Sequence, residues 1–149
     1  MRHTGVLAVR LAVDGVRFSV LCEASRVRDN RVMVTTVLIV DDHPSFRTSA
    51  RRVLEDAGYR VIGEAEDGRS ALDAAEALRP AVVLLDVHLP DIDGFEVALR
   101  LTADDEAPAV VLTSSRDGGE FGAMIADSGA RGFLPKGEVS GPALAALLK

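Results

Sequence analysis

Short apolar runs rich in β-branched residues alternate regularly with longer segments from Thr36 onward, and this alternation constrains the fold most. Runs that are so short and so apolar fit strands covered on both faces, as in a parallel sheet. The five runs are Thr36–Val40, Tyr59–Ile62, Ala81–Leu85, Ala109–Leu112 and Gly132–Leu134. The sequence therefore predicts five strands with a longer segment after each.

The longer segments carry apolar residues at helical spacing and end at stop signals. The first ends at Gly58 and the second runs from about Gly68 to Leu78, while the others begin near Gly94, near Glu120 and after Pro142. Right-handed crossovers place such helices on both faces of one parallel sheet. We therefore expect the α/β class, as a doubly wound (βα)5 flavodoxin-like sheet with strand order 2-1-3-4-5.

Residues 1–32 do not join this pattern. Asp14-Gly15, flanked by apolar runs, is typical of a type I′ hairpin turn. An isolated two-stranded hairpin is only marginally stable, however, and Met33 stands where a natural start would fall. We expect one domain over residues 33–149, preceded by an N-terminal extension that is disordered or is upstream translated sequence.

The charge distribution argues against several partners. Residues 1–32 hold six arginines against three acidic residues, so the remainder carries −9 of a total of −6. A domain this acidic repels nucleic-acid phosphates, and we expect no direct nucleic-acid binding. Apolar stretches near the start are interrupted by Arg10, Asp14 and Arg17, which leaves neither a signal peptide nor a membrane span. With Cys22 as the single cysteine, we expect a cytoplasmic protein.

Three carboxylates follow strands that should be neighbours. Asp41 and Asp42 come directly after the first run, and Asp86 comes directly after the third. In the order 2-1-3-4-5 these strands lie side by side where the order reverses, which is where ligands bind in open α/β sheets. Unpaired carboxylates would repel one another and raise each other's pKa. A few carboxylates with water suit Mg²⁺, so the sequence predicts a magnesium site.

Each aspartate also has an ordinary structural interpretation. Asp42 could cap the helix that opens near Pro44, because Asp at the N-cap and Pro in the first turn are both favoured. Asp86 could form a turn ahead of Pro90 and Gly94. For one aspartate alone the cap is the commoner role, but acids from two loops at one sheet edge favour the metal site.

Thr113 and Lys136 end the fourth and fifth strands at the same edge. A lysine is a compact charge that suits phosphate oxygens, and a hydroxyl can donate a hydrogen bond to one. Alone, Thr113 would be an ordinary strand-end hydroxyl and Lys136 a solvated surface residue. Lys136 is one of only two lysines, the other being Lys149, which supports a specific role.

Four segments together resemble the signature blocks of response-regulator receiver domains. These blocks are Val37–His43, Leu85-Asp86 with Leu89–Gly94, Leu112-Thr113-Ser114, and Phe133–Lys136. The resemblance covers residues 33–149, about one complete receiver. It is strongest to receivers that precede helix-turn-helix output domains, yet no output domain follows, so we expect a stand-alone receiver of a two-component phosphorelay.

The resemblance implies a role for each matching residue. Asp86 would be the phosphoacceptor, receiving its phosphoryl group from a histidine kinase or a phosphotransfer protein. Asp41, Asp42 and Asp86 would hold Mg²⁺ together with the backbone carbonyl of His88. Lys136 would pair with Asp86 and then with the phosphoryl oxygens.

The resemblance also implies a switch. Thr113 would turn toward the phosphoryl group, and Phe133 would follow into the space that Thr113 vacates. The face formed by the fourth helix, the fifth strand and the last helix would then change shape and bind a downstream protein or a second copy. Such a protein is not an enzyme in the usual sense, since it catalyses only its own phosphorylation and dephosphorylation.

Two other function classes compete with this one. Phosphatases of the haloacid-dehalogenase type need a second aspartate two residues after the nucleophile that follows the first strand, but position 43 is His. A receiver-like binding module that has lost phosphorylation usually lacks one of the core groups. Here all five matching positions are filled: Asp41, Asp42, Asp86, Thr113 and Lys136.

Overall fold

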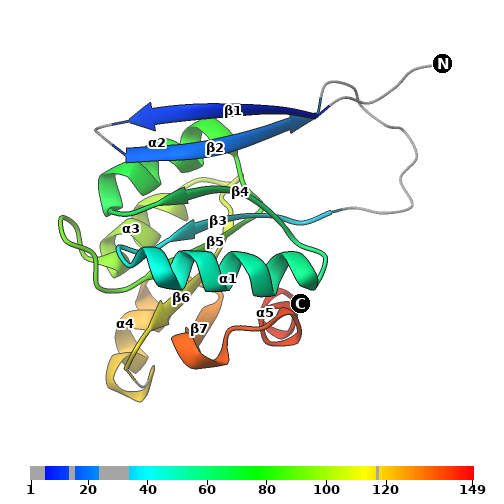
Figure 1. The fold of residues 1–149 in the computed structure, drawn as a ribbon. Helices are drawn as coiled ribbons and strands as arrows, with labels where there is room; N and C mark the ends of the chain where they lie inside the picture. Colours follow the sequence, from blue (N-terminus) through cyan, green and yellow to red (C-terminus); the bar gives the residue numbers. More distant parts are fainter. Residues whose placement is uncertain (1–5, 14–15, 24–33, 117) are drawn as a thin grey trace.

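A computed structural model describes residues 6–13, 16–23, 34–116 and 118–149, and its centre is a parallel sheet of five strands. The strand order is β4-β3-β5-β6-β7, which is 2-1-3-4-5 within the sheet, so the predicted topology is confirmed (Figure 1). The strands are β3 (Thr36–Val40), β4 (Arg60–Ala65), β5 (Val82–Asp86), β6 (Ala109–Ser114) and β7 (Gly132–Pro135).

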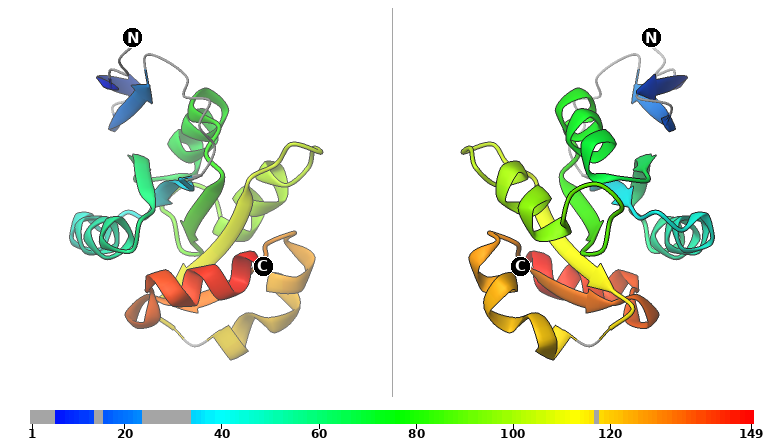
Figure 2. Two further views of the ribbon diagram at one scale, coloured as in Figure 1. Left: turned by 90° about the vertical axis from the view of Figure 1, so that its right-hand side faces the viewer. Right: turned by 90° about the vertical axis from the view of Figure 1, so that its left-hand side faces the viewer.

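Helices cover both faces of this sheet, as right-handed crossovers require (Figure 2). Helices α1 and α5 pack on one face, and α2, α3 and α4 pack on the other. The helices are α1 (Pro44–Asp56), α2 (Gly68–Leu78), α3 (Gly94–Leu101), α4 (Gly122–Asp127) and α5 (Gly141–Leu148), with 3₁₀ turns η1 (Gly118–Phe121) and η2 (Lys136–Glu138).

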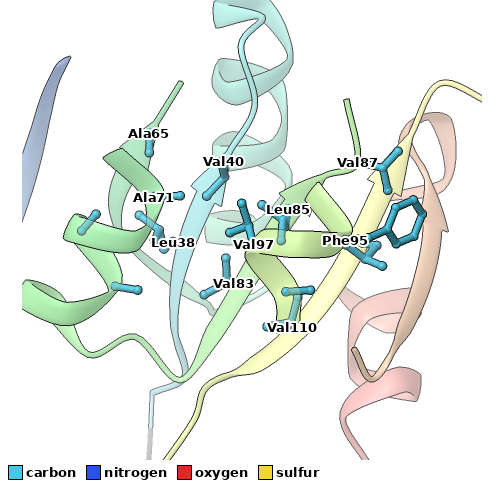
Figure 3. Packing of buried hydrophobic residues seen from close by; sticks show 14 residues of the cluster. Leu38, Val40, Ala65, Ala71, Val83, Leu85, Val87, Phe95, Val97 and Val110 are labelled. Carbon is cyan, nitrogen blue, oxygen red and sulfur yellow. The ribbon is translucent and has the colours of Figure 1, made fainter. Parts of the chain in front are cut away.

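Alternate residues of each strand contribute to two separate cores. On β3, Leu38 and Val40 join the core under α2 and α3, while Val37 and Ile39 join the core under α1 and α5. Figure 3 shows the first of these, in which Val97 of α3 lies over the centre of the sheet. Because both faces of the strands are buried, the runs are apolar throughout, and this fixes the strand ends in place.

The structure refines some predicted boundaries. Helix α2 spans Gly68–Leu78, as the sequence indicates, because Asp67 caps its start and Pro80 follows its end. The segment expected to become helical near Glu120 instead forms η1 first, and α4 begins only at Gly122. Helix α4 buries none of its residues and has no side-chain cap, so the packing that holds it is weak.

The N-terminal segment contains a hairpin of β1 (Val6–Val13) and β2 (Val16–Glu23). The strands are antiparallel with Val13 opposite Val16, in agreement with the hairpin pattern, although Asp14-Gly15 itself lies outside the described residues. Strand β2 lies beside the edge strand β4 (Figure 1). That residues 1–32 are an extension not needed by the domain remains a prediction. None of the helices in the described ranges combines the length and apolar run needed to span a bilayer.

Candidate functional site

An acidic cluster lies where the strand order reverses, at the carboxyl ends of β3 and β5. Asp41 follows β3 and Asp86 ends β5, and these strands are direct neighbours. Ligand atoms of Asp41, Asp42, His43 and Asp86 all lie within 4.8 Å of one another. Asp41 and Asp86 are buried, while Asp42 and His43 are exposed. The structure therefore brings together the three carboxylates that the sequence indicates and adds an imidazole.

The side chain of Lys136 reaches this cluster from the end of β7. Its ammonium nitrogen lies 2.8 Å from Oδ2 of Asp41 and 3.3 Å from Oδ2 of Asp86, and 5.0 Å from the ring centroid of Phe46. The expected pairing with Asp86 is present. The shorter contact to Asp41 was not expected, and it is a charge contact rather than a well-aligned hydrogen bond.

Burial and charge set the protonation of these groups. Burial raises the pKa of Asp86, the charge of Asp41 adds to the rise, and the His88 backbone N–H and Lys136 oppose it. For Lys136, burial works to lower the pKa, but its pairing with Asp41 and Asp86 outweighs burial and raises the pKa. Both shifts have the sign expected for acids crowded around one internal cation. Further positive charge at this cluster would therefore be stabilised.

Thr113 lies opposite Asp86 on the neighbouring strand β6. Its carbonyl accepts a 3.0 Å hydrogen bond from the N–H of Val87. Its hydroxyl is fully buried and has no hydrogen-bond partner within the part of the chain that the structure describes. A buried unpaired hydroxyl costs free energy, so this group has a reason to seek an acceptor that enters the site.

Comparison with known proteins places this geometry in a family. Residues 37–148 match the response regulator receiver domain. The chain belongs to the response-regulator receiver family. Among solved structures it is similar to the signal receiver domain of NarL from Mycobacterium tuberculosis, with 33% identity and a TM-score of 0.71, over 78% of this chain and 98% of that one.

Curated relatives extend beyond the receiver. Response regulator GacA of Pseudomonas protegens is 39% identical over 102 residues, which cover 68% of this chain and 48% of GacA. A protein-glutamate methylesterase/protein-glutamine glutaminase of Hahella chejuensis is also 39% identical over 102 residues, covering 67% of this chain and 29% of that protein. The chain thus spans about half the length of such relatives or less, and what they share with it is the receiver.

Receiver domains in general are phosphorylated on an aspartate, bind Mg²⁺ at an acidic pocket, and interact with histidine kinases and downstream effectors. In this receiver the donors fit a small divalent cation. They are carboxylate oxygens, which Mg²⁺ prefers. Oδ2 of Asp41 is buried without an aligned hydrogen bond, as expected of an oxygen that can serve as a ligand.

The interpretation of Asp42 as the cap of the first helix is wrong. The N-cap of α1 is His43, and no side chain caps this helix. Asp42 Oδ1 instead lies 3.1 Å from Nδ1 of His43. Asp86 does take part in a turn, since its Oδ1 accepts a 3.1 Å hydrogen bond from the N–H of His88, but it does so from within the acidic cluster.

Backbone contacts hold the two buried acids in position. Asp41 Oδ1 accepts the N–H of His43 at 2.8 Å, and its carbonyl accepts Nη1 of Arg47 at 2.6 Å. Behind Asp86, a Cβ at Gly94 would overlap the Asp86 carbonyl oxygen, so only glycine allows α3 to begin there. Nothing in the sequence pattern pointed to Arg47, because an arginine on an amphipathic helix is ordinarily a solvated residue.

Phe121 of η1 joins the loop after Asp86 to the predicted switch residue Phe133. Its ring centroid lies 6.0 Å from that of His88, 5.5 Å from that of Phe95 and 6.2 Å from that of Phe133. These separations are typical of interacting aromatic pairs. Sequence reasoning missed Phe121, since it stands in a segment whose helical periodicity is weak.

Proposed function

We propose that this receiver accepts a phosphoryl group on Asp86 from a histidine kinase or phosphotransfer protein, and that Mg²⁺ is required. The observation that supports this most is the placement of Asp86. Its carboxylate ends β5 at the point where the strand order reverses, with Lys136 3.3 Å from one oxygen and Asp41 close by. A carboxylate in this setting is both positioned and electrostatically supported as a nucleophile.

In the transfer step, a carboxylate oxygen of Asp86 forms a bond to phosphorus while the P–N bond of the donor phosphohistidine breaks. The leaving imidazole retains the electron pair of that bond. Such transfers pass through a loose transition state, so the protein contributes mainly in-line positioning and charge neutralisation. A bound Mg²⁺, held by Asp41, Asp42, Asp86 and the carbonyl of His88, would supply part of that neutralisation.

Lys136 contributes the remaining positive charge. Its ammonium group already contacts the carboxylates of Asp41 and Asp86, so a short displacement brings it to phosphoryl oxygens on Asp86. The unpaired hydroxyl of Thr113 is the neighbouring donor, and it gains its missing partner by turning to the same oxygens.

The response then reaches the face made by α4, β7 and α5. Movement of Thr113 frees volume that close-packed interiors do not leave empty, and Phe133 on the neighbouring strand is placed to fill it. Phe133 carries Phe121 with it, because their rings are in contact. Helix α4, which buries none of its residues, offers little resistance. We propose that the altered face binds a downstream protein or a second copy of the chain.

Acetyl phosphate tests the proposal directly. With Mg²⁺, the full chain should gain one phosphoryl group by intact-mass measurement, and Asp86→Asn should gain none while keeping its fold. Asp105→Asn, an exposed substitution of the same chemistry, should react like the wild type. Phosphate mapped to another residue, with Asp86 unmodified, contradicts the assignment. No reaction in the folded wild type would favour a binding module that has lost phosphorylation.

A further inference from the structure

The imidazole of His43 lies against the acidic cluster. Its Nδ1 is 3.0 Å from Oδ1 of Asp41 and 3.1 Å from Oδ1 of Asp42. His43 is the N-cap residue of α1, and its backbone N–H is bound to Asp41 Oδ1 at 2.8 Å, which restrains the side chain near the carboxylates. The side chain is 65% exposed, so an ion in solution can reach it.

The spacing of these atoms is that of ligands to one ion. Two atoms bound at right angles to a cation, each at about 2.1 Å, lie about 3.0 Å apart. The imidazole nitrogen stands at this separation from two carboxylate oxygens, and a buried Asp41 oxygen without an aligned hydrogen bond completes the cluster. Nothing in the described chain has to move far for His43 and both aspartates to share a cation.

A nitrogen ligand changes which cation a site prefers. Magnesium is a hard ion that takes oxygen ligands, whereas Co²⁺, Ni²⁺, Zn²⁺ and Fe²⁺ accept imidazole readily and bind mixed nitrogen and oxygen sites more tightly. We propose that His43 is a metal ligand of this receiver, and that it makes the acidic cluster a site for divalent transition-metal ions as well as for Mg²⁺. This inference rests on the metal site of the proposed function.

A different role for His43 is a positive charge that neutralises Asp41 and Asp42 without contacting a metal. The two roles have opposite consequences for substitution. Removal of a ligand weakens only those ions that use nitrogen, whereas removal of a positive neighbour strengthens binding of every cation. A merely structural role would weaken all cations by the same factor.

Calorimetric titration of Co²⁺ and Mg²⁺ separates these roles. Both titrations are done at pH 8, where a histidine with its ordinary pKa is neutral. All proteins are full-length and carry His3→Asn, so that the amino-terminal histidine does not compete for Co²⁺. Adding His43→Asn should weaken Co²⁺ binding by about tenfold or more and change Mg²⁺ binding by less than about twofold. The visible absorption of bound Co²⁺ should also shift when the nitrogen ligand is lost.

Three results would overturn the inference. Equal weakening of both ions assigns His43 a structural role, and unchanged or tighter Co²⁺ binding removes it from the metal altogether. Absence of any Co²⁺ or Mg²⁺ binding before His43 is changed contradicts the metal site of the proposed function itself. A His43→Gln variant, in the same background, repeats the comparison with a longer side chain should the Asn variant fold poorly.

Discussion

The ammonium nitrogen of Lys136 lies 2.8 Å from Oδ2 of Asp41, although the two residues come from the far ends of the receiver sequence. This contact is shorter than the one between Lys136 and the proposed phosphoacceptor, Asp86. Lys136 therefore acts as an internal cation for both buried acids. A metal that uses the oxygens of Asp41 competes with Lys136 for the same negative charge.

Replacement of Lys136 by Met should expose this competition. The buried acids then lose their cation, and the metal-free protein should lose about 2 kcal/mol, between the values for buried and exposed ion pairs. Mg²⁺ should restore much of the loss, because it binds more tightly once Lys136 is gone. Thermal melts with chelator and with Mg²⁺ measure both effects.

Lys149→Met, at the only other lysine, is the matched control and should melt like the wild type. If Mg²⁺ raises the melting temperature of Lys136→Met by no more than that of the wild type, the two cations do not compete.

Asp91 should stabilise the receiver in a pH-dependent way. Its carboxylate accepts the backbone N–H groups of Gly68 and Arg69 at the start of α2, at 2.7 and 2.9 Å. Burial works slightly to raise the pKa of Asp91, but these bonds and one from Ile92 outweigh it and lower the pKa below the ordinary 3.8. Asp91→Ala should cost about 1 kcal/mol at pH 7, as loss of a helix cap does.

A lowered pKa means that this contribution is fully present above about pH 4 and is lost as the pH falls through the folded-state value. Urea unfolding of wild type and Asp91→Ala at pH 7, 4 and 3 should show the difference shrinking with acid. A difference that stays constant across this range would show that the carboxylate charge is not involved. Asp105→Ala serves as an exposed control.

Arg79→Gly should raise stability. Arg79 ends α2 with φ of +51°, the left-handed region that a residue with a Cβ enters only at a cost. Glycine removes this cost, with an expected gain of about 0.5–1 kcal/mol. The ion pair that is lost, with Glu106 at 3.9 Å, is highly exposed and contributes little.

Urea midpoints compare Arg79→Gly with Glu106→Ala, which removes the same ion pair but leaves the backbone unchanged. A lower midpoint for Arg79→Gly, matched by an equal fall in Glu106→Ala, would mean that the ion pair outweighs the backbone strain.

Thr113→Val should separate phosphorylation from the response. The methyl group replaces a buried hydroxyl that has no partner in the described chain, so stability should be unchanged or slightly higher. The variant should accept phosphate on Asp86 yet shift its population weakly, since its side chain cannot turn to bond the phosphoryl oxygens. Backbone chemical shifts over residues 123–133, with and without acetyl phosphate and Mg²⁺, measure this.

Thr113→Ser keeps the hydroxyl and should recover most of the shift. Full chemical-shift changes in phosphorylated Thr113→Val would show that Phe133 responds by another route.

Deletion of residues 1–32 should leave the receiver folded and able to be phosphorylated. The five-stranded sheet and both cores are complete without the hairpin. Strand β2 does lie beside β4, so the melting temperature of the shortened chain is the sensitive measurement. An aggregated product, or one that acetyl phosphate fails to modify, would make the hairpin a structural part of the domain.

The sequence by itself determined the architecture. Both faces of the strands are buried, so each strand had to be an apolar run, and such runs are visible without any tertiary information. Strand order then followed from crossover handedness together with the resemblance to receivers. The convergence of Asp41 and Asp86 was predictable for the same reason, because both stand at strand ends and the sheet topology alone brings neighbouring strand ends together.

Only the tertiary structure decided how the side chains pair. Sequence reasoning joined Lys136 to Asp86, but the chain leaves β7 at an angle that brings the ammonium group closer to Asp41. The bonds from Asp91 to the start of α2 and the stack of Phe121 on Phe133 were equally invisible. These contacts join loops that are distant in sequence, and loops have no periodicity from which their side-chain positions follow. Periodicity determines which residues are buried, whereas a pairing within the site depends on distances of a few ångströms between independent loops, and only the folded chain sets those distances.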